Sequence, residues 1–313
     1  MGNNLLSVII PSRTEEYLQK TVDDILLKAK GEIEIIVILD GYWPKEHNWA
    51  NSKIRIIHQG TIDNNMGMRA AINAGMSIAQ GEFVMKTDEH CMFDEGFDEK
   101  LKNDCQDDWV VIPRRYRLDP ENWVIFEDGR SPIDYMYLAY PYERQGDKTC
   151  GLHGELWKER YYEKKDILID DTMSWQGSCY FLKKKYWNEL IHPLDEINYG
   201  TFTQEAQEIG NKVWLSGGRL VVNKKTWYAH FHKGKRGKNY GFTNEQYKNH
   251  REEMERGRKF CIDYWLNTKD YKYDFEWLLK KFWPVPGWKN TWKEDIIRDV
   301  KFDYSVVGDL INK

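Results

Sequence analysis

Continuous apolar runs divide the first third of the chain, and helix-like segments separate them. In these runs neighbouring positions are apolar on both faces, unlike the alternating pattern of a strand with one face in water. The runs occupy residues 5–11, 32–40, 53–60 and 82–88. The segments 14–29 and 65–81 lie between them; the first has apolar residues at helical spacing and the second is rich in small residues. This alternation predicts an α/β fold with a mostly parallel central sheet and helices on both faces.

The pattern changes near residue 109, where strands with turns and longer loops replace the regular alternation. Further on, the sequence predicts a strand running into a helix, a helix closed by Gly217-Gly218 with a strand after it, and a strongly charged helix. We therefore expect one domain over residues 1–242, with halves 1–107 and 108–242. A helical, aromatic extension over residues 243–313 is expected to pack on it.

Composition narrows the classes of protein that fit. Apolar residues make up 41% of the chain and the net charge is −4, so wholesale disorder is not expected and nothing attracts the whole chain to nucleic acid. The five cysteines have no CxxC spacing, which indicates neither a zinc site nor a disulfide framework. No apolar run reaches the roughly 20 residues of a membrane helix, and the N-terminus looks like a strand rather than a signal peptide. We expect a soluble, cytoplasmic protein without membrane insertion.

Polar residues collect where the predicted strands end. Ser12 and Arg13 follow the first strand, Asp40 ends the second, and Asp88-Glu89-His90 ends the fourth. The carboxyl ends of parallel strands meet at one edge of the sheet, which is where ligands bind in such folds. These positions therefore predict a binding site at that edge.

Asp88 and His90 are candidate metal ligands. Residues two apart in a strand point the same way, so a carboxylate and an imidazole would lie side by side. Mixed oxygen and nitrogen ligation suits Mn²⁺, whereas Mg²⁺ prefers oxygen alone. A third ligand would come from His230 or His232, which share a face of a later strand. The alternative is a hydrogen-bonded buried histidine beside an aspartate that caps a turn.

Several segments resemble GT-A (Rossmann-like) glycosyltransferases of family 2. In the first half they are SVIIPSRTEEYLQKTVDDIL, EIIVILDG, the Gly-Met-Arg-Ala-Ala turn at 67–71 and Asp88-Glu89-His90. In the second half TMSWQGSCYFLKKKYW, TQEAQEIGNKVWLSGG and YAHFHK are similar to the catalytic domain of polypeptide N-acetylgalactosaminyltransferases, whose metal motif is also Asp-x-His. The resemblance covers roughly residues 5–235 and rests on the order and spacing of these segments.

The resemblance implies a metal-dependent transfer of a hexosyl or N-acetylhexosaminyl group from a UDP-sugar to an acceptor hydroxyl. Asp88, His90 and His230 would hold Mn²⁺ (or Mg²⁺), with His232 as the alternative third ligand. Asp40 would face the nucleobase, and Glu205 falls on the acceptor-side acidic position. The residues implied in donor binding are Pro11, Arg13, Glu15, Asp40, Gly67, Arg69, Asp88, Glu89, Lys233 and Arg236.

Two departures from the family pattern leave the stereochemistry open. Gln204 stands where the family has a glycine, and the Glu-Asp pair of inverting family 2 enzymes is missing. Glu205 and Asp88 are the candidate catalytic residues. If the reaction inverts, Glu205 would be the base; if it retains, Glu205 would position the acceptor. Glu205 and Glu208 are one turn apart, so the alternative for both is solvated helix surface.

The acceptor stays open between a saccharide, a protein and modified DNA. Aromatic and basic residues interleave at 224–242 and 271–293, a pattern that can stack sugars or bases. A viral enzyme acting on hydroxymethylated DNA in the host cytoplasm is one interpretation. A non-catalytic module that binds a sugar nucleotide or a glycan is a hypothesis of another class.

Overall fold

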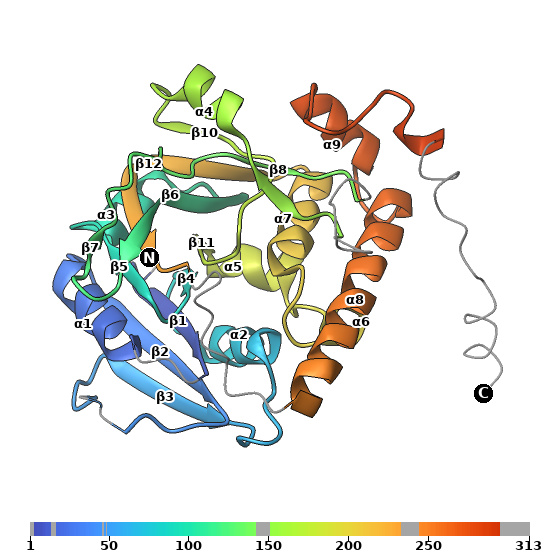
Figure 1. Cartoon of the computed structure of the whole chain (residues 1–313). Coiled ribbons are helices and arrows are strands. Elements are labelled where there is room, and N and C mark those ends of the chain that lie inside the picture. Colours follow the sequence, from blue (N-terminus) through green and yellow to red (C-terminus); the bar gives the residue numbers. More distant parts are fainter. Residues whose placement is uncertain are drawn as a thin grey trace.

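A computed structural model describes residues 3–13, 17–45, 47, 49–141, 151–232 and 244–294. Its main feature is a sheet in which the strands follow the order β10-β12-β6-β11-β4-β1-β2-β3 (Figure 1). Along the chain these are β1 (Leu6–Ser12), β2 (Ile33–Asp40), β3 (Ile54–Gln59), β4 (Phe83–Thr87), β6 (Trp109–Asp119), β10 (Ile169–Asp171), β11 (Cys179–Lys183) and β12 (Arg219–His230).

Short strands complete the β structure. β5 (Cys91–Phe93) pairs with β12 and β7 (Val124–Ile125) pairs with β6, while β8 (Met136–Leu138) and β9 (Gly154–Leu156) form a separate ribbon. The helices are α1 (Leu18–Lys28), α2 (Met68–Ile78), α3 (Phe97–Asp104), α4 (Lys158–Lys164), α5 (Lys184–Tyr186), the π-helix Trp187–Ile191, α6 (Glu196–Tyr199), α7 (Glu205–Ser216), α8 (Asn244–Asn267) and α9 (Phe275–Phe282).

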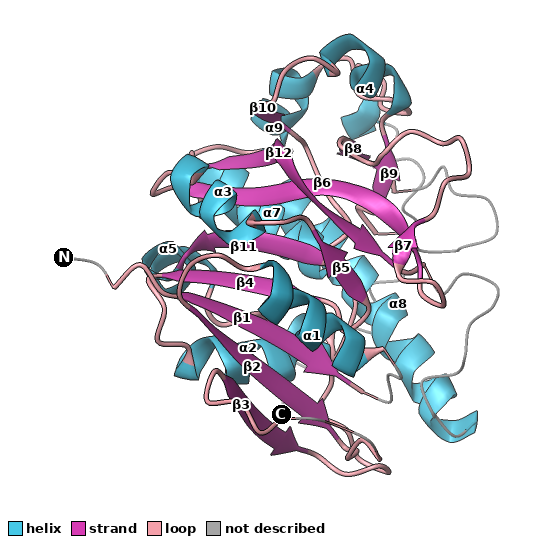
Figure 2. Cartoon of the chain, turned by 90° about the vertical axis from the view of Figure 1, so that its left-hand side faces the viewer, coloured by secondary structure: helices cyan, strands magenta, loops and turns pink. Residues whose placement is uncertain are grey.

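The side chains of β1 alternate between two hydrophobic cores, which explains its continuous apolar sequence. Val8 and Ile10 pack with α1 and α3 on the face seen in Figure 2, and Ile9 packs with α2 and α7 on the other face. A strand covered on both sides has no water-facing positions, so every residue is apolar or bonded. The predicted α/β class, with helices on both faces, is confirmed.

The sheet is mixed, and this refines the predicted parallel arrangement. The pairs β1–β2, β2–β3, β1–β4 and β6–β12 are parallel. β11 lies antiparallel to both β4 and β6, and β10 lies antiparallel to β12. The strands of the first half, β1 to β4, are therefore parallel to one another, whereas β11 runs antiparallel to its neighbours β4 and β6.

The described part of the C-terminal extension shares a core with the sheet. Trp265 of α8 donates from Nε1 to the Tyr199 hydroxyl at 2.7 Å, and Trp288 donates from Nε1 to the Leu138 carbonyl at 2.6 Å. Cys261 and Leu278 are fully buried in the same cluster as the strands. The division at residue 242 stays a prediction; in the structure α8 contacts α6 and α7, and α9 contacts α7 and α8. Within the described ranges, no helix is long and apolar enough to cross a membrane.

Candidate active site

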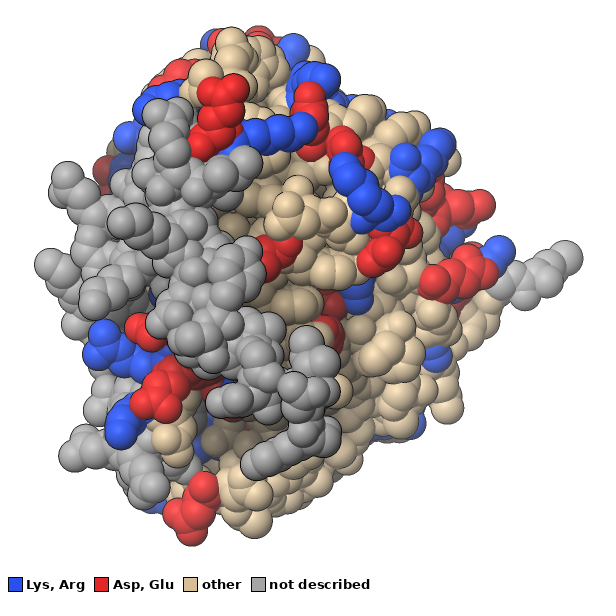
Figure 3. All heavy atoms as spheres, turned by 90° about the vertical axis from the view of Figure 1, so that its right-hand side faces the viewer, with Lys and Arg blue, Asp and Glu red and all other residues tan. Residues whose placement is uncertain are grey.

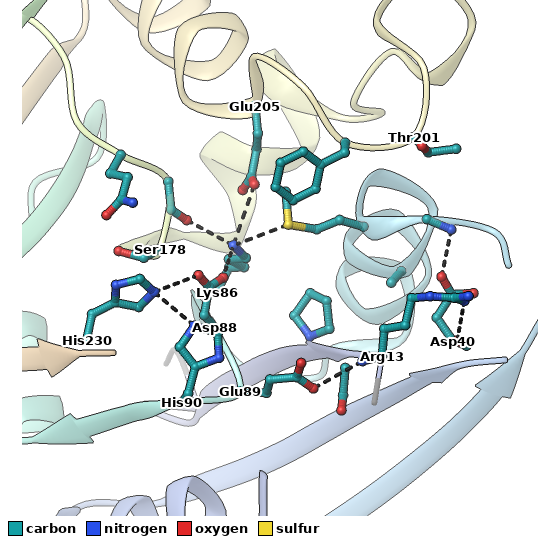
Figure 4. A pocket seen from close by; sticks show the side chains of 18 of the residues that line it. Arg13, Asp40, Lys86, Asp88, Glu89, His90, Ser178, Thr201, Glu205 and His230 are labelled. Carbon is teal, nitrogen blue, oxygen red and sulfur yellow. Dashed lines mark hydrogen bonds and ion pairs between the residues drawn. The ribbon is translucent and has the colours of Figure 1, made fainter. Parts of the chain in front are cut away.

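A cavity of about 340 Å³ opens at the carboxyl ends of β1, β2 and β4. Many of the residues singled out from the sequence line it: Pro11, Arg13, Asp40, Gly67, Asp88, Glu89, His90, Glu205 and His230. Figure 4 shows 18 of the lining side chains and labels ten of them, with Arg13 and Asp40 at one end and Glu205 above Lys86. Glu15, Lys233 and Arg236 lie outside the described residues.

Asp88, His90 and His230 converge on one point. The Nε2 atoms of His90 and His230 are 3.1 Å apart, and Asp88 Oδ2 is 3.1 Å from His230 Nε2. All three ligand atoms lie within 4.8 Å of one another. Two imidazole nitrogens at this separation can bind the same ion, each at the roughly 2.0–2.2 Å of a metal–nitrogen bond. The donor set of one carboxylate and two imidazoles fits a divalent transition metal.

The main chain brings the ligands together by a route that differs from the expected one. β4 ends at Thr87 and β5 begins at Cys91, so Asp88 and His90 lie in the turn between two strands rather than in a strand. β12 then pairs His230 with Cys91, which places the third ligand beside the turn. His232 lines the cavity but is outside the three-residue cluster.

The protonation of the ligands suits a metal. Burial lowers the pKa of His230 to about 3, so its ring is neutral near pH 7 and can offer a nitrogen lone pair. Burial alone would raise the pKa of Asp88, but Lys86 and the hydrogen bond with His230 hold it well below its usual value. The carboxylate is therefore ionised.

Lys86 is a site residue that the sequence reasoning missed. Its side chain is 1% exposed, and its ammonium donates to Asp88 Oδ1 at 2.7 Å and to the Gly177 carbonyl at 2.9 Å. It also lies 3.5 Å from Glu205 Oε2. Burial opposes the charge, but Asp88 and Glu205 raise the pKa of Lys86 above its usual value. A lysine inside the apolar run FVMKT was the available signal, because a cation buried there needs an acidic partner.

At the opposite end, Asp40 organises the turn before α2. Its two carboxylate oxygens accept the backbone N–H groups of Met66 and Gly67, each at 2.7 Å. Arg13 donates from Nη1 to the Asp40 carbonyl at 3.1 Å, and its backbone N–H donates to Glu89 Oε2 at 3.1 Å. Arg13, Asp40 and Glu89, the residues expected to bind the sugar nucleotide, are therefore also bonded to one another.

Arg69 does not line the cavity, contrary to its expected place near the donor. It is fully buried, and its guanidinium forms an ion pair with Glu208 and donates to the Thr203 carbonyl. The Tyr199 ring lies 4.4 Å from the guanidinium carbon. Arg69 joins α2 to α7 because a buried guanidinium takes the nearest carboxylate rather than a distant ligand.

Glu205 and Glu208 are both buried, at 4% and 1% exposure, so the solvated-surface interpretation is wrong. They point to different partners. Glu208 pairs with Arg69 and Lys212, whereas Glu205 faces the cavity and Lys86. Burial raises the pKa of Glu205, with Lys86 acting in the opposite direction. A carboxylate with a raised pKa at a cavity wall is suited to accept a proton.

Comparison with known proteins places this site in a family. The sequence model of glycosyl transferase family 2 matches residues 7–173, more than half of the chain. The chain belongs to that family. The match contains the lining residues Arg13, Asp40 and Gly67 together with Asp88 and His90, whereas Glu205 and His230 lie beyond it.

Two curated relatives are glycosyltransferases of Streptococcus pneumoniae. GlyG is 31% identical over 238 residues, which cover 73% of this chain and 65% of GlyG. GlyA is 22% identical over 232 residues, which cover 72% of this chain and 30% of GlyA. The chain thus spans less than two thirds of each of them.

The fold matches a solved structure described as "Crystal structure of GalNAc-T7 with UDP, GalNAc and Mn2+". The TM-score is 0.60 at 16% identity, over 88% of this chain and 57% of that one. The GT-A fold and the resemblance to a family 2-like glycosyltransferase are thereby confirmed.

Proposed function

We propose that the chain transfers a sugar from a UDP-sugar to an acceptor hydroxyl, with a divalent cation, Mn²⁺ in preference to Mg²⁺, held by Asp88, His90 and His230. The observation that carries this proposal is the convergence of the three ligand atoms at the strand ends. A relative in fold was crystallised with UDP, GalNAc and Mn²⁺, which supports the same donor class here. When bound, the cation would offset the charge of the diphosphate leaving group.

In this proposal the donor lies between Asp40 and the metal ligands. Arg13 and the turn at Met66-Gly67 form the nucleotide end, and both are fixed by Asp40. The bond from the anomeric carbon to the diphosphate breaks, and its electron pair leaves with the diphosphate. The acceptor oxygen forms the new bond to that carbon.

Glu205 is the proposed acceptor of the hydroxyl proton. Its carboxylate lies at the cavity wall, and its pKa is raised by burial. Lys86 lies between Glu205 and Asp88 and bonds to the Gly177 carbonyl, so it fixes the acceptor side relative to the metal ligands. Lys86 therefore acts as a positioning residue.

The competing function, a non-catalytic binding module, gains no support from the cavity. A degenerate transferase would be expected to lose metal ligands or the acceptor-side acid, yet Asp88, His90, His230 and Glu205 all line the cavity. A cytoplasmic location and a viral role in DNA modification stay predictions.

Release of UDP from a panel of UDP-sugars, with Mn²⁺ or with chelator, tests the proposal. We expect Mn²⁺-dependent release that Asp88→Ala and His90→Ala abolish while circular dichroism stays unchanged. GDP-sugars used equally well, or release that persists in chelator, would contradict it.

A further inference from the structure

The cavity wall facing the metal ligands is built from segments beyond the family match. Gln176 to Ser178, Thr201, Phe202 and Glu205 form this wall, and His250 of α8 completes it. The family sequence model ends at residue 173. The end of the cavity formed by Arg13 and Asp40 therefore lies within the family match, and the opposite wall lies beyond it.

An aromatic pair stands on that wall. Phe202 is 42% exposed although it lines a cavity, and its ring centroid is 5.7 Å from that of His250, at an interplanar angle of 60°. The two rings come from different segments, one just before α7 and one from α8. A large apolar ring left accessible inside a cavity is available to a ligand.

Helix α8 packs against this wall and bonds to it. Glu253 Oε2 accepts the Thr201 hydroxyl at 2.8 Å, and Thr201 in turn accepts the Arg69 backbone N–H at 3.2 Å. Gly257 packs so closely on the same segment that an added Cβ would lie 2.5 Å from the Tyr199 carbonyl oxygen. Phe202 is therefore presented from a segment fixed on both sides, by α2 and by α8, as a preorganised binding surface requires.

We propose that Phe202 and His250 form a stacking subsite for a pyranose ring of a saccharide acceptor. This inference rests on the proposed function and names the acceptor class of the same cavity. A pyranose has an apolar C–H face and a rim of hydroxyls. The Phe202 ring matches the face, and Glu205 can accept a hydroxyl at the rim.

The charges at the cavity favour a neutral acceptor over nucleic acid. Among the described lining residues, the arginine and lysine cations are Arg13 and Lys86, and both already bond within the protein. Asp88, Glu89 and Glu205 add negative charge. On the α8 and α9 side, acidic and basic side chains are interspersed over the described surface (Figure 3). Within the described residues, this cavity therefore offers no cationic groove of the kind that binds a phosphate-bearing strand.

The test compares Phe202→Ala and Phe202→Tyr with Phe126→Ala, a control at a phenylalanine that is 50% exposed and outside the cavity lining. Transfer is measured from a UDP-sugar to methyl pyranosides and disaccharides of glucose, galactose and N-acetylhexosamines. We expect Phe202→Ala to raise the acceptor KM about tenfold or more, with a smaller change in kcat. Phe202→Tyr should restore most of it, and Phe126→Ala should leave it unchanged.

A second measurement needs no turnover. Saturation-transfer NMR of the UDP-loaded protein with the same methyl pyranosides should show contacts that Phe202→Ala removes. Absence of contacts with the unsubstituted chain, or use of a peptide or hydroxymethylated DNA with a KM indifferent to Phe202→Ala, would overturn the inference. Acceptor-free hydrolysis of the UDP-sugar by the unsubstituted chain reports separately on the proposed function.

Discussion

Lys86 Nζ lies 2.7 Å from Asp88 Oδ1, in a side chain that is 1% exposed. The lysine thereby orients a proposed metal ligand, and it lies 3.5 Å from Glu205 Oε2. Lys86→Met keeps the chain length but leaves two carboxylates without their shared cation. Because loss of a group that orients a metal ligand typically costs about 10–100-fold in metal affinity or activity, we expect a fall of that size in Mn²⁺ affinity and in kcat.

Titration calorimetry with Mn²⁺ in the presence of UDP measures this effect. Lys100→Met is the matched control, since Lys100 is 41% exposed and pairs with Asp94 away from the cavity. Unchanged Mn²⁺ affinity in Lys86→Met would mean that Asp88 is oriented without the lysine.

A comparison of two alanine variants tests whether His230 or His232 is the third metal ligand. His230 belongs to the cluster with Asp88 and His90, whereas His232 lies outside it. The ring centroids of His230 and His232 are 5.2 Å apart. We expect His230→Ala to lose Mn²⁺ binding and His232→Ala to retain most of it. Electron paramagnetic resonance of free Mn²⁺ at equal protein concentration gives the answer. The reverse order would make His232 the third ligand.

Glu205 and Glu208 lie one turn apart on α7 and should fail in different ways. Glu205→Gln keeps the size of the side chain but removes the proposed base, so kcat should fall by roughly 10²–10⁴ with donor affinity little changed. Glu208→Ala leaves Arg69 buried without its carboxylate and should cost roughly 3–5 kcal/mol in the free energy of unfolding.

Steady-state kinetics and urea unfolding of both variants distinguish these roles. If Glu205→Gln raises only the acceptor KM, Glu205 positions the acceptor instead of taking its proton. A normal rate and KM would place the acceptor-side acid elsewhere.

The sequence predicted those strands and helices whose formation depends on residues close together in the chain. The strand Ile33–Asp40 and the helix Met68–Ile78 follow from local apolar patterns, and Asp88 and His90 stand out because polar residues interrupt an apolar run. Arg69 was misplaced because its partner, Glu208, is 139 positions away in the chain. Only tertiary packing decides which buried carboxylate a guanidinium meets.

The same limit applies to the far wall of the cavity. Phe202 and His250 meet because α8 packs against the segment before α7, and no periodic pattern encodes that contact. Lys86 was within reach of the sequence, since burial of a lysine predicts an acidic partner, but the pattern could not say which one.

Glu34 makes part of the stability dependent on pH. Burial alone would raise its pKa, but hydrogen bonds from Ser7, Gln80 N–H and Arg55 lower it below the usual value. A carboxyl whose folded-state pKa is depressed stabilises the protein above its unfolded-state pKa of about 4.3 and loses that contribution as the pH falls through the folded-state value.

We therefore expect Glu34→Gln to lower the urea midpoint at pH 7 and to converge with the unsubstituted chain below about pH 4. Chemical unfolding at pH 7, 5 and 3.5 measures the difference. If the two urea midpoints differ by the same amount at all three pH values, the ionised form of Glu34 does not contribute to the stability.

Asp40 was expected to read the uracil base, and its contacts favour a different role. Both of its carboxylate oxygens accept backbone N–H groups of the turn that precedes α2, and Gly67 in that turn has a φ of +90°. Asp40→Asn replaces one acceptor oxygen with an N–H donor, so one backbone amide loses its partner. An unsatisfied buried amide costs roughly 1–3 kcal/mol, which should loosen the turn and weaken nucleotide binding by roughly tenfold.

The affinities of Asp40→Asn for UDP and for GDP distinguish a role in holding the turn from a role in reading the base. If Asp40 holds the turn, Asp40→Asn should weaken UDP and GDP by similar factors in titration calorimetry, because the turn would contact parts common to both. If it reads the base, UDP should lose affinity while GDP stays the same. Asp63→Asn, an exposed carboxylate in the same loop, controls for the change in charge. Loss confined to UDP would return Asp40 to the base-reading role.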